Sequence, residues 1–104
     1  MDNKKESVFM VYETYSDGCA YEESLGYEGV RLEEDAFRTY EEALTRCKDL
    51  QEKLIDKVRK ERLCEDFPDE DVQYGIEDGY VKDVHYVAFD NDYWTFYPVE
   101  IVIN

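Results

Sequence analysis

The chain has 104 residues, which predicts a single compact domain, 1–104, with one modest hydrophobic core. Its net charge of −15 disfavours direct binding to nucleic acid or to an anionic membrane, since phosphate contacts need Lys and Arg. Its aromatic content of 15% excludes a disordered acidic tail. Three cysteines in no metal-binding pattern, with neither a leader-like nor a membrane-length apolar run, predict a cytoplasmic protein.

The first third of the chain predicts two strands separated by an acidic loop. Residues 7–15 are rich in β-branched and aromatic side chains and predict a strand. Residues 16–29 contain three glycines and several acids, which favour a loop or a loose hairpin arm. The alternation over 30–32 predicts a short second strand.

A long amphipathic helix is the clearest element of the sequence. Thr39 and Glu42 form a capping-box pattern, which marks a helix start. Apolar residues follow at steps of three and four, so one face of the helix is expected to be apolar. Pro68 sets an outer limit, and the expected length is about 25 residues, or about 38 Å. The apolar positions are Tyr40, Ala43, Leu44, Cys47, Leu50, Leu54, Val58 and Leu63.

The last third predicts an acidic segment followed by strands. Residues 65–79 are punctuated by proline and glycine and predict a loop. Residues 80–90 and 93–97 predict two strands that flank an Asp-Asn-Asp turn. Pro98 is expected to interrupt the last strand at an edge or a bulge, and 99–103 continue it.

The element order predicts an α+β fold. We expect an antiparallel sheet of four to five strands, in the order ββαββ, with one long amphipathic helix packed on one face. Such an order joins neighbouring strands by short connections and leaves the helix to bury the apolar side of the sheet.

The negative charge is unevenly distributed along the chain. The net charge is −6 over residues 1–38, +1 over 39–64 and −10 over 65–104. The predicted helix is therefore not the acidic element, and its acids and bases follow the helix dipole. The candidate partner-binding residues are Asp17, Glu22, Glu23, Glu28, Glu65, Asp66, Asp69, Glu70, Asp71, Tyr74, Glu77, Asp78, Asp90 and Asp92.

These acids favour a protein that mimics the charge of nucleic acid. Duplex DNA carries one negative charge per about 1.7 Å, and a groove built for it is lined with Arg and Lys. Carboxylates accept paired hydrogen bonds from Arg as phosphates do. We therefore expect a small inhibitor of a basic, nucleic-acid-binding protein, of the anti-restriction or anti-CRISPR type made by phages and mobile elements.

Two other classes of function are open at this stage. A regulatory or adaptor module could bind a protein through the acidic loops, or accept a strand at the edge near 99–103. A homodimer could form through that edge or through the overhanging helix. Alternatively, residues 99–103 form a central strand packed under the helix.

Catalysis and metal binding have weaker support, and the sequence suggests no cofactor. His85 is the single histidine, and of the cysteines Cys47 lies on the apolar helix face, where it is expected to be buried and inert. The carboxylates of 69–71 and 90–92 suit a hard cation such as Ca²⁺, but neither run has the EF-hand spacing. The sequence therefore predicts a protein that is not an enzyme.

Overall fold

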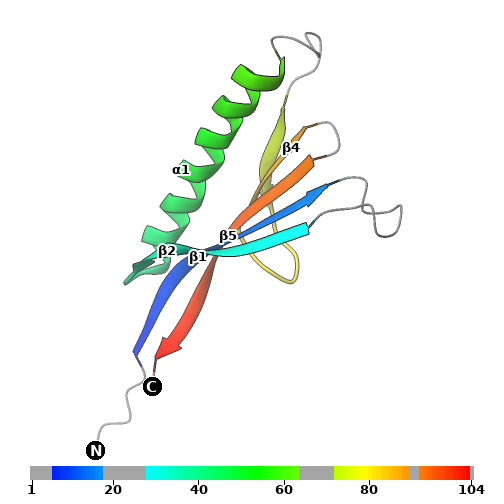
Figure 1. The fold of residues 1–104 in the computed structure, drawn as a ribbon. Coiled ribbons are helices and arrows are strands. Elements are labelled where there is room, and N and C mark those ends of the chain that lie inside the picture. The colour runs from blue at the N-terminus through cyan, green and yellow to red at the C-terminus, as the bar shows by residue number, and fades with distance from the viewer. Residues whose placement is uncertain (1–5, 18–27, 64–71, 90–91, 104) are drawn as a thin grey trace, which may run out of the picture.

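The protein is an α+β structure built on one antiparallel sheet. The computed structural model describes residues 6–17, 28–63, 72–89 and 92–103. The sheet has five strands in the spatial order β2-β1-β5-β4-β3, and the one described α-helix lies across one face of it (Figure 1). In chain order the elements are β1 (Glu6–Asp17), β2 (Glu28–Phe37), α1 (Tyr40–Val58), the π-helical turn η3 (Arg59–Leu63), β3 (Gln73–Glu77), β4 (Val84–Phe89) and β5 (Asp92–Ile103).

The helix begins where the capping box predicts. The Thr39 hydroxyl accepts a hydrogen bond from the Glu42 backbone N–H at 3.2 Å, and the Glu42 carboxylate accepts one from the Thr39 N–H at 3.2 Å. Both bonds satisfy backbone donors that have no partner inside the helix. The expected length is also confirmed, because α1 and η3 together run from Tyr40 to Leu63.

The buried stripe of α1 is narrower than the predicted apolar face. The buried positions recur every three or four residues and comprise Ala43, Cys47, Gln51, Ile55 and Val58. Leu44, Leu50 and Leu54 flank this stripe and are only half-buried. Gln51 and Ile55 were not among the predicted positions. The prediction centred the apolar face on the leucines, whereas the buried stripe lies beside them and includes Gln51 and Ile55.

Two neighbouring clusters make up the core between α1 and the sheet. One contains Ile55, Val58, Val72, Val87 and Phe89, and the other contains Val11, Cys47 and Phe96. Leu54 and Trp94 pack against both, so the two clusters are continuous. Burying such side chains contributes about 1.5–3 kcal/mol each, which makes this face the main source of stability.

The strand count corrects the predicted order ββαββ to ββαβββ. The additional strand is β3, which lies inside the segment 65–79 that the sequence predicts as a loop. β3 is an edge strand with mostly exposed side chains, so it carries no apolar alternation to reveal it. Its backbone pairing with β4 holds it in place.

β2 is also longer than the three residues predicted, because the register shift opposite Met10 and Tyr12 breaks its alternation. Residues 80–83 precede β4 instead of forming part of it.

Pro98 does not interrupt the last strand. β5 is continuous from Asp92 to Ile103 and lies in the centre of the sheet, with Pro98 paired to Val11 of β1. The pairing of β4 with β5 ends at Phe96, so Pro98 has one described neighbouring strand and a missing N–H is tolerated there. Among the described residues, no helix is long and apolar enough to cross a membrane.

Candidate protein-binding site

The ends of all five strands align at one end of the sheet, which we call the acidic end. β1 and β4 finish there, and β5 starts there. β2 and β3 both begin at the same end. The register pairs that define it are Asp17–Asp92, Ser16–Glu28, Phe89–Asp92 and Gln73–Ala88.

The C-terminal part of the helix reaches the same end. Val58, near the end of α1, packs in one cluster with Val72 and Phe89. In Figure 1 the green helix finishes beside the end of the sheet where β3 begins. The chain therefore leaves the described helix and enters β3 at the acidic end.

The segments joined to the acidic end carry negative charge alone. Segments 18–27, 64–71 and 90–91 hold eight acids and no Lys or Arg. Each is connected on both sides to described residues at this end. These acids lie outside the described residues and are Glu22, Glu23, Glu65, Asp66, Asp69, Glu70, Asp71 and Asp90. The described residues that flank each of these segments therefore lie at one end of the sheet.

Three more of the predicted residues lie in the strands at this end. Asp17 closes β1, Glu28 opens β2 and Asp92 opens β5. The Tyr15 hydroxyl donates a hydrogen bond of 2.7 Å to an Asp92 carboxylate oxygen, and the Tyr15 ring lies 5.5 Å from Trp94. A carboxylate that accepts from a packed tyrosine is held in one orientation, which favours a defined contact over a diffuse charge.

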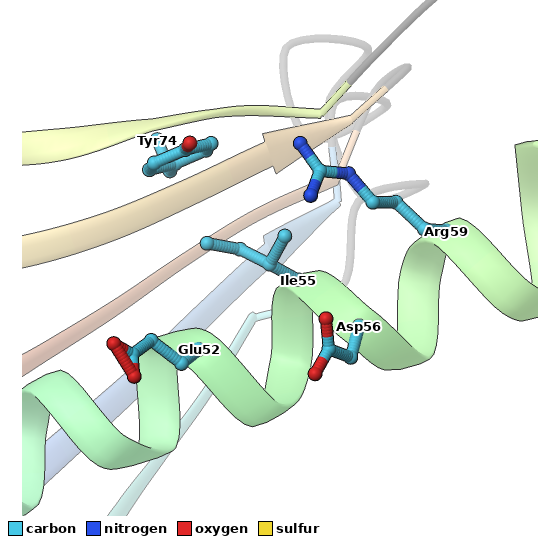
Figure 2. Close-up of a pocket in the computed structure, with 5 residues that line it drawn as sticks. All are labelled: Glu52, Ile55, Asp56, Arg59 and Tyr74. Carbon is cyan, nitrogen blue, oxygen red and sulfur yellow. The ribbon is translucent and has the colours of Figure 1, made fainter.

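A groove between α1 and β3 borders the acidic end. Its volume is about 310 Å³, and it is lined by Glu52, Ile55, Asp56, Arg59 and Tyr74. Figure 2 shows Arg59 reaching from the helix toward the Tyr74 ring, and its guanidinium carbon lies 6.0 Å from the ring centroid. The Tyr74 side chain is half exposed, and it stands on the strand β3 where the sequence predicts a loop.

The groove offers two carboxylates and an aromatic ring within one concave surface. Glu52 and Asp56 lie one helical turn apart and are both exposed. An aromatic face beside carboxylates suits a cationic side chain of a partner. The sequence-based prediction missed both acids. They could have been found because they are like charges four residues apart, on a helix whose other charges are mostly spaced to form ion pairs.

Two predicted residues lie at the opposite end of the sheet. β3 runs away from the acidic end, so Glu77 closes it opposite Val84. Asp78 follows, and its carboxylate accepts a 2.9 Å hydrogen bond from the Asp83 backbone N–H. The sequence predicts residues 65–79 as one loop, but the five-residue strand β3 places Glu77 at the end of the sheet opposite the acidic end.

The groups considered for catalysis are packed in the core. Cys47 is fully buried, and burial raises the pKa of its thiol to about 12. His85 is also buried, with Nδ1 2.9 Å from the Asp83 carbonyl oxygen, so that nitrogen carries the proton. Cys19 and Cys64 lie outside the described residues. In the part of the chain that the structure describes, no group of three or more His, Cys, Asp or Glu is arranged to hold a metal ion.

Comparisons with known proteins identify no relative. No family model, no curated protein and no solved structure matches the chain. The function is therefore argued from the charge, the register and the groove described above.

Proposed function

We propose that the protein binds a basic surface of another protein through its acidic end, and that it competes with nucleic acid for that surface. The observation that supports this is the strand register, which brings the strand ends that flank three base-free acidic segments to the same end of one sheet. Asp17, Glu28 and Asp92 add three aspartate or glutamate positions in the strands there.

Charge spacing supports competition with nucleic acid. Neighbouring strands are about 4.8 Å apart and same-face residues about 6.8 Å apart, so carboxylates on a sheet end can lie at separations similar to those of phosphates. The field of a chain with net charge −15 also speeds association with a basic partner. Inhibitors of restriction or CRISPR systems, made by phages and mobile elements, form the class that this mechanism fits.

The groove of Glu52, Asp56 and Tyr74 supports a contact with one cationic side chain of the partner. An Arg or Lys that enters it would meet two carboxylates and the Tyr74 ring. Arg59 already lies beside Tyr74, so an incoming cation would have to displace it. This contact would give the interface a specific anchor in addition to its charge.

The proposed function is non-enzymatic. Cys47 and His85 have structural surroundings, since one is fully buried and the other donates to a nearby backbone carbonyl. Direct binding to nucleic acid or to an anionic membrane is disfavoured by the net charge. A cytoplasmic location stays a prediction from the cysteine pattern.

An affinity capture tests the proposal. Tagged full-length protein is incubated with nuclease-treated cell lysate and washed at low and then high salt, and the captured proteins are identified by mass spectrometry. We expect a nucleic-acid-binding protein that high salt or added duplex DNA releases. A partner that DNA does not displace would contradict competition with nucleic acid and favour a regulatory or adaptor module.

Charge-reversed variants locate the contact. Reversal of Asp69, Glu70 and Asp71 to Lys should lower recovery of that partner at least tenfold. The matched control reverses three exposed acids outside the acidic end, Glu34, Glu41 and Glu100, and changes the net charge by the same amount. Equal losses in both variants would show that the total charge, and not the acidic end, holds the partner.

A further inference from the structure

The sheet has a second face that no described element covers. Side chains alternate along a strand, so Val11 and Phe96 point to α1 while their neighbours Tyr12 and Tyr97 point away. Figure 1 shows α1 on one side of the sheet only. We call the side opposite α1 the open face.

Over the three central strands the open face carries one charged residue, Glu6 at the start of β1, which pairs with Ile103. The remaining residues of the face are every second one along β1 from Val8 to Ser16, along β4 from Val84 to Ala88 and along β5 from Tyr93 to Ile103. None of these residues is charged, although 38% of the chain is. The solvent-facing side of a sheet normally carries polar and charged side chains. These residues are instead uncharged and rich in tyrosine, which is the composition of an interface.

Tyrosines are packed flat over this face. Tyr12 and Tyr97 have ring centroids 5.4 Å apart, and Tyr86 and Tyr93 form a stacked pair at 5.9 Å. A Cβ at Gly75 would lie 3.1 Å from the Tyr86 ring, so a glycine at this position lets the ring lie across β3. The rings are thereby held in place before any partner arrives, which lowers the entropy lost on binding.

The Thr14 and Thr95 hydroxyls are hydrogen-bonded to each other between the two ring pairs. Their polar groups therefore have partners within the face itself. Burial also raises the pKa of Tyr93 and of Tyr97 above the usual value, which agrees with a surface already partly removed from water.

We propose that a second copy of this chain covers the open face, so that two sheets pack face to face in a symmetric dimer. A chain with net charge −15 repels its own copy over its charged surfaces, and a face whose centre carries no charge, with Glu6 and Glu77 at its margins, is where two copies can approach. A basic partner would gain no ion pair at the centre of the open face, so this interface is separate from the acidic end and independent of the proposed function.

The area of the face is sufficient for a dimer. Each residue occupies about 33 Å² of a sheet face, from about 4.8 Å between strands and about 6.8 Å between same-face residues. The fourteen residues named above then cover roughly 460 Å² per copy, and their open-face partners Leu32, Ala36 and Gly75 raise this to roughly 560 Å², which brings the pair to the ~1,000 Å² that a specific interface needs. Sheets packed in this way lie about 10 Å apart.

Sedimentation velocity on the full chain tests the dimer. We expect a mass twice the 12.4 kDa of the monomer at micromolar concentration. Leu32→Glu and Ile101→Glu place a charge at exposed positions of the open face and should each raise the dissociation constant at least tenfold. The matched control is Ile76→Glu, an exposed position on the helix side of β3, which should stay dimeric.

Circular dichroism first establishes that all three variants are folded. A monomeric wild-type protein at 100 µM would overturn the proposal. Protection of its open-face tyrosines from hydroxyl-radical labelling would then assign the cover to a segment of the same chain. A dimer that Ile76→Glu breaks, and that Leu32→Glu and Ile101→Glu leave intact, would place the interface elsewhere and also overturn the proposal.

Discussion

The two faces of the sheet are built from the same strands but differ in how deeply their side chains are buried. On the helix side, Val11, Val87 and Cys47 are fully buried. On the open face the tyrosines are half-buried against one another, and Leu32 is exposed. The helix side therefore carries the stability of the fold, while the open face is left available for an interaction. The predictions below test this division.

The largest difference in the free energy of unfolding is expected between variants of two neighbouring residues of β5. Phe96 faces the helix in the cluster with Val11 and Cys47, and Phe96→Ala should lower the free energy of unfolding by about 3–5 kcal/mol. Tyr97 faces away and pairs with Tyr12, so Tyr97→Ala should cost about 1–2 kcal/mol. Urea unfolding, followed by circular dichroism at one low protein concentration, measures both.

Phe96→Leu serves as a second variant if Phe96→Ala does not fold, with an expected loss of about 1–1.5 kcal/mol. Equal losses for Phe96→Ala and Tyr97→Ala would contradict the division between the faces, since the open face would then be part of the core.

A smaller effect is expected at the polar link between the helix and the sheet. The buried Gln51 donates from Nε2 to the carbonyl oxygens of Gly75 and Tyr86, at 2.9 Å each, and so ties α1 to β3 and β4. Gln51→Ala leaves both carbonyls without this donor and should cost about 1–3 kcal/mol in urea unfolding.

The matched control is Gln73→Ala, an exposed glutamine of β3, which should change stability by less than about 0.5 kcal/mol. A loss at Gln51 no larger than the loss at Gln73 would mean that apolar packing alone positions the helix.

The smallest effect concerns the hydrogen bond between the helix start and the loop before β4. The Tyr40 hydroxyl donates to the Asp83 carboxylate, and Tyr40→Phe should cost about 1 kcal/mol at neutral pH. Burial and Asp83 raise the pKa of Tyr40 from 10.0 to about 12. Tyr40 thus stabilises the fold below pH 10, and this contribution is lost as the pH rises toward 12.

Stability measured from pH 8 to 12 should therefore fall less steeply in Tyr40→Phe than in the wild type. Some slope will persist, because burial raises the pKa of Cys47 to about 12 as well. The control Tyr80→Phe changes a fully exposed tyrosine and should leave the stability at neutral pH unchanged. An identical slope in Tyr40→Phe and wild type would show that this hydroxyl does not titrate with unfolding.

Local patterns in the sequence predicted the elements that carry their own signals. Thr39 and Glu42 identify the helix start, because a capping box satisfies backbone donors within four residues. Residues 7–15 identify most of β1, and the Asp-Asn-Asp turn identifies the hairpin of β4 and β5. The excess of acids was also visible, since charge depends on composition alone.

Only the tertiary structure decided where these elements meet. β3 is an edge strand that exists through backbone pairing with β4, and Gln51 is buried because two carbonyls lie within its reach. The alignment of strand ends at the acidic end, and the tyrosine-rich face opposite α1, likewise follow from long-range register. The pairing of β1 with β5 joins residues more than 70 positions apart in the chain, so no local pattern of side chains could show that these strands are neighbours.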